Sequence, residues 1–111
     1  MRLHELGQLD DARFARRYAE DKRELSGWGP ERIGDALRER GVDGETVAAA
    51  LGVDDGAREA ERAASLLASR GDPLRDELAR SRAFAYLRRR GYPAEVAYDA
   101  VRRMESRREA A

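Results

Sequence analysis

Residues 27–42 read GWGPERIGDALRERGV, and this stretch sets the pattern for the whole chain. Gly29-Pro30 is typical of a helix start, because proline at the first helical position loses no hydrogen bond. Ile33 and Leu37 lie four residues apart, as they would on the buried face of a helix. Gly41 follows an arginine-rich last turn and is typical of the left-handed residue that ends a helix. The stretch therefore predicts a turn, a helix and a second turn.

The same pattern returns about fifty residues later in the chain. When Gly41 is set over Gly91, the aligned pairs are Arg32 and Arg82, Ile33 and Ala83, Leu37 and Leu87, Val42 and Tyr92 and, after a one-residue gap, Val47 and Val96. Two copies of one three-helix unit are the simplest explanation. We therefore predict an elongated, all-α fold with complete repeats at 9–53 and 54–105 and a charged tail at 106–111. Because each unit is small, we expect the two repeats to share buried faces.

Capping residues and helix breakers divide the chain into six expected helices. The expected starts are Asp10, Pro30, Asp43, Asp54, Asp72-Pro73 and Pro93. The side chains expected to point inward include Phe14, Ala15, Tyr18 and Ala19 in the first helix and Leu74, Leu78, Phe84 and Leu87 in the fifth. The residues after Met104 are strongly charged, and we expect them to fray.

The composition argues against several kinds of function. The 111 residues include 22 basic and 22 acidic side chains, no cysteine and one histidine, His4. A disulfide framework and a thiolate metal site are therefore excluded, and a Ser-His-Asp triad is disfavoured. No apolar stretch approaches the length of a membrane span, and the N-terminus lacks the apolar segment of a signal peptide. We expect a soluble, cytoplasmic and monomeric protein.

Two motifs resemble catalytic or binding sites only superficially. The acidic pairs Asp10-Asp11 and Asp54-Asp55 stand at expected helix starts, where carboxylates cap free N–H groups. The glycines of 27–30 follow no strand and lack the Lys and Ser or Thr of a phosphate-binding loop, so they predict a tight turn covered by Trp28. We expect neither enzymatic activity nor a bound cofactor.

Charge is distributed unevenly along the chain. Residues 1–56 carry nine basic and thirteen acidic side chains, whereas residues 80–108 carry nine basic and three acidic ones. Within the basic segment, Arg82, Tyr86 and Arg89 share one helix face, with Arg90 beside them. Arginine with an interleaved aromatic ring suits phosphate and stacked bases, and it suits an acidic protein surface equally well. A solvated helix face with no partner is the third interpretation.

The motifs LDDARFA at 9–15 and GWGPERI at 27–33, followed by Leu37 and Gly41, resemble the middle repeat of the RecX family of RecA regulators. The run LRRRGY at 87–92 resembles the last repeat of the same family. The residues that carry the family signature here are Asp10, Asp11, Phe14, Ala15, Gly27, Gly29, Pro30, Arg32, Ile33, Leu37, Gly41, Leu87 and Gly91. The resemblance extends over roughly residues 3–104.

This resemblance implies a cytoplasmic bacterial protein without catalytic chemistry of its own. Such proteins bind RecA, especially as a filament on single-stranded DNA, and they modulate recombination and the SOS response, usually by inhibition. The family usually has three repeats, and residues 1–8 resemble only a remnant of the first. The alternative function is a helical protein that binds nucleic acid directly through the basic face of its C-terminal repeat.

Overall fold

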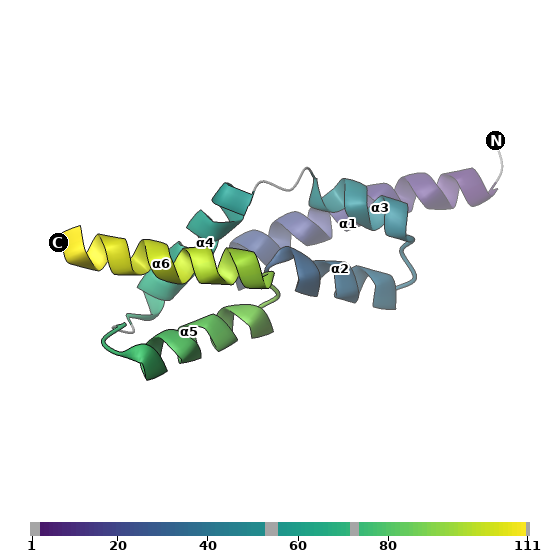
Figure 1. The fold of residues 1–111 in the computed structure, drawn as a ribbon. Coiled ribbons are helices and arrows are strands. Elements are labelled where there is room, and N and C mark those ends of the chain that lie inside the picture. The colour runs from purple at the N-terminus through teal and green to yellow at the C-terminus, as the bar shows by residue number, and fades with distance from the viewer. Residues whose placement is uncertain (1–2, 53–55, 72–73, 111) are drawn as a thin grey trace.

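The computed structural model describes residues 3–52, 56–71 and 74–110, and within these ranges the chain forms six helices and no strand. The helices are α1 (Leu3–Ser26), α2 (Pro30–Glu39), α3 (Gly44–Leu51), α4 (Gly56–Arg70), α5 (Glu77–Arg89) and α6 (Ala94–Ala110). We refer to α1–α3 as repeat 1 and to α4–α6 as repeat 2 (Figure 1). The molecule is 59 Å long and 21 Å across, so the prediction of an elongated, all-α tandem fold is confirmed. None of the helices in the described ranges combines the length and the apolar character of a membrane span.

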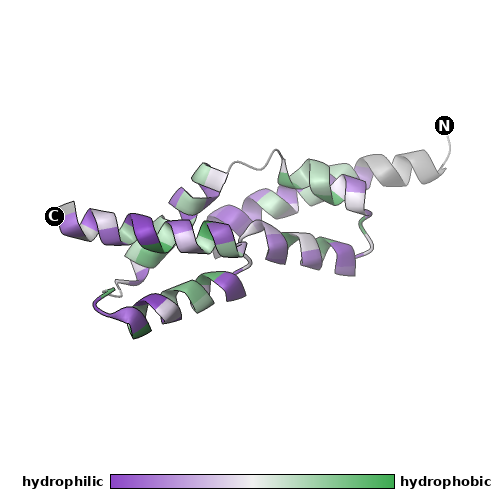
Figure 2. Cartoon of the chain, viewed as in Figure 1, coloured by the Kyte–Doolittle hydropathy of each residue, from purple (hydrophilic) through white to green (hydrophobic). Residues whose placement is uncertain are grey.

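Each repeat has a hydrophobic core of its own. The core of repeat 1 contains Ala15, Ala19, Ile33, Leu37, Val42 and Val47. The core of repeat 2 contains Ala60, Ala63, Ala64, Leu67, Leu74, Ala83, Leu87, Tyr92, Val96, Ala97, Ala100 and Val101. Figure 2 shows apolar stretches on helices of both repeats. The two apolar cores are separate, so the buried faces that the repeats share are those of the junction described below.

The turn between the second and third helices has the same backbone geometry in both repeats. Gly41 has φ +85° and Gly91 has φ +101°, a region that favours glycine, which has no Cβ. Val42 N–H donates to the Leu37 carbonyl at 3.1 Å, and Tyr92 N–H donates to the Leu87 carbonyl at 3.0 Å. The predicted left-handed glycine caps are therefore confirmed, and the turns support the alignment of the two repeats.

The predicted helix starts are right at Pro30 and Asp43 and wrong at Asp10, and α6 begins at Ala94, one residue after the predicted start at Pro93. Pro30 is the first residue of α2, and the Asp43 side chain accepts a hydrogen bond from Thr46 N–H at 2.8 Å. Asp10 does not cap a helix, because α1 already begins at Leu3 and nothing between these residues breaks it. The predicted cap Asp54 lies outside the described residues.

The fifth helix begins later than the sequence predicts. The Asp72-Pro73 start lies outside the described residues, but α5 begins at Glu77, and the Asp76 side chain accepts a hydrogen bond from Ala79 N–H at 2.8 Å. Leu74 precedes the helix and is buried. Leu78 is 58% exposed, so its predicted inward position is wrong. It stands nine residues before the buried Leu87, and nine residues are two and a half helical turns, which place it on the opposite side.

Two further side-chain and helix-end predictions need correction. Phe14 is 44% exposed and packs against Tyr18, with ring centroids 5.7 Å apart, while Ala15 and Ala19 form the buried face of α1. The segment after Met104 is helical, because α6 continues to Ala110. Arg103 and Arg107 on this helix both pair with Glu61 on α4, and these ion pairs hold the extension of α6 against α4.

Candidate interaction surface at the repeat junction

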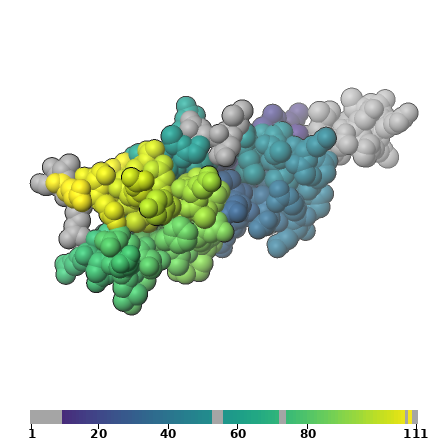
Figure 3. Space-filling view, in the orientation of Figure 1, coloured from purple at the N-terminus to yellow at the C-terminus, as the bar shows by residue number. Residues whose placement is uncertain are grey.

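Backbone hydrogen bonds join the two repeats. Gly29 N–H donates to the Arg90 carbonyl at 2.8 Å, and Glu31 N–H donates to the Gly91 carbonyl at 2.9 Å. A Cβ on Gly29 would lie 2.5 Å from the Gly91 carbonyl oxygen, and a Cβ on Gly91 would lie 2.3 Å from the Cβ of Arg32. The two chain segments can approach this closely only because both positions are glycine. Figure 3 shows the neighbouring parts of α2 (blue) and α5 (light green) in contact.

Tyr92 strengthens this junction from repeat 2. Its hydroxyl donates a hydrogen bond to the Gly27 carbonyl at 3.2 Å. Burial raises the pKa of the Tyr92 phenol to about 12, because the charged phenolate would be poorly solvated there. Arg88 adds an ion pair with Glu31 at 2.7 Å and also donates to the Tyr92 carbonyl. The junction is thus largely polar.

A buried carboxylate lies on the other side of the junction. Glu59 on α4 is 5% exposed and pairs with Arg62 at 2.9 Å and, across the junction, with Arg23 at 3.8 Å. Arg23 also donates to the Leu51 carbonyl at 2.7 Å. A buried carboxylate needs such partners, because an unpaired charge is costly away from water. The C-terminal turn of α1 is therefore connected to α4 by an ion pair.

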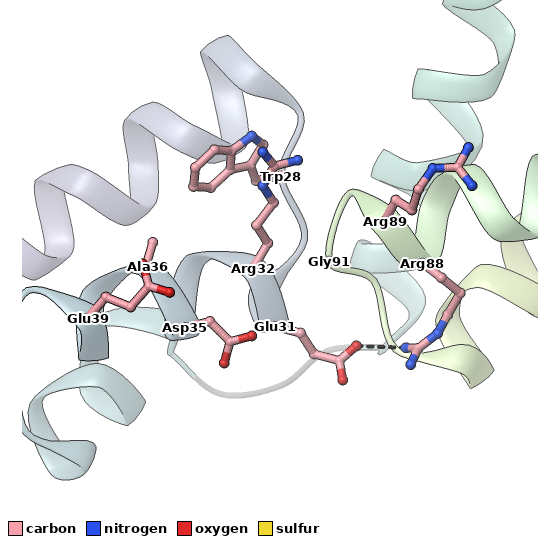
Figure 4. Close-up of a pocket in the computed structure, with 9 residues that line it drawn as sticks. All are labelled: Trp28, Glu31, Arg32, Asp35, Ala36, Glu39, Arg88, Arg89 and Gly91. Carbon is pink, nitrogen blue, oxygen red and sulfur yellow. Dashed lines mark hydrogen bonds and ion pairs between the residues drawn. The ribbon is translucent and has the colours of Figure 1, made fainter.

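The junction opens into a groove of about 530 Å³ between α2 and the end of α5 (Figure 4). Its lining residues are Trp28, Glu31, Arg32, Asp35, Ala36, Glu39, Arg88, Arg89 and Gly91. Acidic side chains line the α2 wall, and arginines come from the α5 end. The Arg32 guanidinium stacks over the Trp28 ring, 4.2 Å from its centroid. The groove therefore offers both hydrogen-bond donors and hydrogen-bond acceptors.

The structure separates the four residues predicted to bind a partner into two kinds. Arg82 and Arg89 are exposed, and neither forms an ion pair within the described ranges. Tyr86 is half-buried, with the Arg70 guanidinium 3.7 Å and the Arg90 guanidinium 5.8 Å from its ring centroid. Arg90 is partly buried, and its Nε has no hydrogen-bond partner. Arg82 and Arg89 are thus available to a partner, whereas Arg90 and Tyr86 also contribute to packing.

Sequence reasoning missed a second group of stacked cations, in repeat 1. Lys22 Nζ lies 4.6 Å from the Trp28 ring centroid and 5.5 Å from that of Tyr18. The Arg40 guanidinium lies 4.8 Å from the Tyr18 ring centroid. A signal was available, because an aromatic residue precedes a cation by four positions in Tyr18–Lys22, Trp28–Arg32 and Tyr86–Arg90.

The signature residues have structural roles in most cases. Ala15, Ile33, Leu37 and Leu87 belong to the two cores, and Gly41 shapes a turn. Gly27, Gly29, Pro30, Arg32 and Gly91 form or flank the junction. Asp10 and Asp11 are exposed, and Phe14 is partly so. Across the described residues, no group of three acidic or histidine side chains is arranged to hold a metal ion.

Comparison with known proteins finds one family model and several relatives that this chain resembles. Residues 10–51 match the family model described as "RecX, second three-helix domain". The chain is 35% identical over 107 residues to the regulatory protein RecX of Mycolicibacterium smegmatis, covering 90% of this chain and 57% of the relative. It is 37% identical over 109 residues to the regulatory protein RecX of Thermobifida fusca, covering 91% and 56%. No solved structure matches significantly.

The fold and the junction define a protein built of tandem three-helix units. The chain belongs to the RecX family. A third relative, the regulatory protein RecX of Deinococcus radiodurans, is 37% identical over 102 residues, with 91% of this chain and 48% of the relative covered. The chain thus spans about half the length of the curated relatives it matches.

Proposed function

We propose that this chain modulates the RecA recombinase, in the direction of inhibition, by binding the RecA filament on single-stranded DNA. The observation that carries this proposal is the similarity over 90% of the chain to proteins named regulatory protein RecX. On this proposal the chain acts in the cytoplasm as a monomer, without chemistry of its own, and regulates recombination and the SOS response. Its repeats and surface, rather than a reactive pocket, perform the task.

The exposed arginines Arg82 and Arg89 are the contacts that we assign to RecA. They lie in the segment with nine basic and three acidic side chains, so they face an acidic patch of the partner. The acidic side chains on α2 suit a basic patch on a neighbouring part of the filament. Exposed charges of this kind are screened by salt, and binding should weaken steeply as salt is raised.

The test is a binding titration of the chain with RecA filaments on single-stranded DNA, together with the rate of RecA-dependent strand exchange. Replacing Arg82 and Arg89 by Ala should weaken filament binding about tenfold or more and relieve inhibition, because two charge contacts are lost. Arg90 is left unchanged, since it packs at the junction. The matched control replaces the exposed Arg75 and Arg102 by Ala and should bind like the unmodified chain.

Two results would contradict the proposal. If the unmodified chain does not bind RecA filaments or alter strand exchange, the assigned partner is wrong. If the two double variants bind alike, the assigned contact residues are wrong. Circular dichroism of each variant must show unchanged helix content, so that a loss of binding is not a loss of folding.

A further inference from the structure

Cations stacked on aromatic rings gather on both sides of the repeat junction. In repeat 1 they form a continuous series, because Lys22 contacts both Tyr18 and Trp28 while Arg40 and Arg32 cover the outer rings. In repeat 2 a second series consists of two arginines over one tyrosine. We name the set the cation–aromatic ladder; its members are Arg40, Tyr18, Lys22, Trp28, Arg32, Arg90, Tyr86 and Arg70.

The two series meet where the repeats join. Arg90 Nη2 lies 3.4 Å from the position of a Cβ on Gly27, the residue directly before Trp28. On the other side of Trp28, Arg32 and Arg89 line the same groove from opposite repeats (Figure 4). The ladder therefore runs from α1 and α2 across the junction to α4 and α5, along the long axis of the molecule.

We infer that the cation–aromatic ladder binds a single strand of nucleic acid directly, with its centre at Trp28 and Arg32. A guanidinium that contacts a ring through its face has its edge N–H groups left to donate to phosphate oxygens. Its outer face is a platform on which a base can stack, and arginine planes and aromatic rings are the surfaces that unpaired bases use. The alternation of cations with rings supplies phosphate contacts and stacking platforms together, and an unpaired strand uses both.

Two of the acidic side chains near the ladder form ion pairs with arginines outside it. Of those that line the groove, Glu31 pairs with Arg88 at 2.7 Å and Asp35 pairs with Arg38 at 3.4 Å. Glu39 is the remaining groove carboxylate. The ladder itself carries five cations and no carboxylate. A phosphate backbone that follows the ladder thus meets a series of cations.

A single strand fits better than a duplex for a geometric reason. The ladder side chains come from several helices and turns rather than from one recognition helix that could enter a groove of double-stranded DNA. Bases in a duplex are stacked on each other and are not available to rings or guanidinium planes. This inference needs no RecA, so it is tested on the chain alone and stands or falls separately from the proposed function.

The experiment titrates the chain with a labelled twenty-residue oligothymidylate and follows two signals. Fluorescence anisotropy of the label gives the affinity, and the emission of Trp28, the one tryptophan in the sequence, reports contact at the ladder. We expect binding with quenched Trp28 emission. We also expect a slope near −3 for log K against log salt, as for about four phosphate contacts at roughly 0.7 each on a single strand.

Variants locate the site. Arg32→Ala keeps the Cβ that touches Gly91 and should weaken binding about tenfold, because one stacking platform and one phosphate contact are lost. Arg32→Lys keeps the positive charge but loses the planar guanidinium. Its affinity should therefore lie between those of the unmodified chain and Arg32→Ala. Arg102→Ala is the matched control, because Arg102 also stacks on a ring, 5.8 Å from the Tyr98 centroid, but on α6. It should bind within about twofold of the unmodified chain, because it leaves every ladder contact in place.

Four outcomes would overturn the inference. They are absence of binding at low salt, binding that leaves Trp28 emission unchanged, equal losses in Arg32→Ala and Arg102→Ala, and a duplex that binds as tightly as the single strand. Polyglutamate serves as the acidic polypeptide probe. If it binds as tightly as oligothymidylate and quenches Trp28 equally, the ladder is a surface for acidic proteins instead.

Discussion

Repeat 1 and repeat 2 have the same order of helices and turns but differ in the side chains at equivalent positions. Leu37 and Leu87 are both fully buried at equivalent positions, so each core is built around the same leucine. At the next equivalent pair, Val42 fills the core of repeat 1, whereas Tyr92 is buried in repeat 2 and also reaches the Gly27 carbonyl in repeat 1. The residue at this position thus only packs in the core of repeat 1, whereas in repeat 2 it packs in the core and also connects the two repeats.

The difference in the third helices is equally informative. α3 ends at Leu51, where Gly52 allows the chain to turn toward α4, while α6 continues to Ala110 and pairs with Glu61. The extra turns of α6 thus lie against α4 of the same repeat. Repeat 2 is consequently the better covered of the two, and its core is the larger.

The largest expected effect comes from breaking one core at a time. Leu37→Ala and Leu87→Ala should each cost about 2–5 kcal/mol, because each removes a fully buried leucine side chain. Since the cores share no residue, Leu37→Ala should shift the Trp28 fluorescence transition to lower denaturant than the circular dichroism transition. Leu87→Ala should do the reverse. Coincident transitions in both variants would show that the two repeats unfold as one unit.

A smaller effect is expected at the junction. Gly29 has φ −84°, so alanine fits its backbone, but the added Cβ meets the Gly91 carbonyl. Gly29→Ala should therefore cost about 1–3 kcal/mol, as overpacked sites do. Gly44→Ala is the control, because its Cβ would have nothing within 4 Å, and it should be neutral or slightly stabilising. Urea unfolding of both variants is the measurement, and equal stabilities would refute the close approach.

The smallest effect is expected at the Tyr92 hydroxyl. Tyr92→Phe should cost about 1 kcal/mol near neutral pH, because it removes one hydrogen bond. In the unmodified chain, stability should fall as pH rises from about 10 toward about 12, since the unfolded tyrosine ionises first and the raised folded pKa delays ionisation. In Tyr92→Phe, the part of this loss of stability that comes from Tyr92 should be absent. In Tyr98→Phe, which replaces an exposed tyrosine, it should remain. Urea midpoints across this pH range decide the matter, and an unchanged fall in Tyr92→Phe would contradict the assigned burial.

The sequence predicts what local periodicity encodes. The spacing of Ile33 and Leu37, and the glycines at 41 and 91, give the helices, the turns and the repeat. Leu78 is misplaced because the prediction puts it on one helix face with Leu74, whereas Leu74 precedes α5 and Leu78 lies on the side of α5 opposite Leu87. The helix start depends on Asp76, a capping residue that looks no stronger in sequence than Asp72.

The junction and the ladder cannot be predicted from local sequence patterns, because both depend on contacts between distant parts of the chain. Gly29 and Gly91 are far apart in the chain, and no local pattern states that their backbones meet. The charge excess of repeat 2 directs attention to Arg82 and Arg89, while the mixed charges of repeat 1 hide Lys22, Arg32 and Arg40 among carboxylates. Only the folded arrangement shows that these cations lie on rings.

Because main-chain atoms form the central bonds between the repeats, the relative orientation of the two units does not depend on the identity of most outward-facing side chains. Substitutions on the outer faces can therefore change what the molecule recognises while its geometry as a scaffold stays the same. A protein engineer could treat the glycine contact as a fixed joint and redesign the faces on either side of it independently.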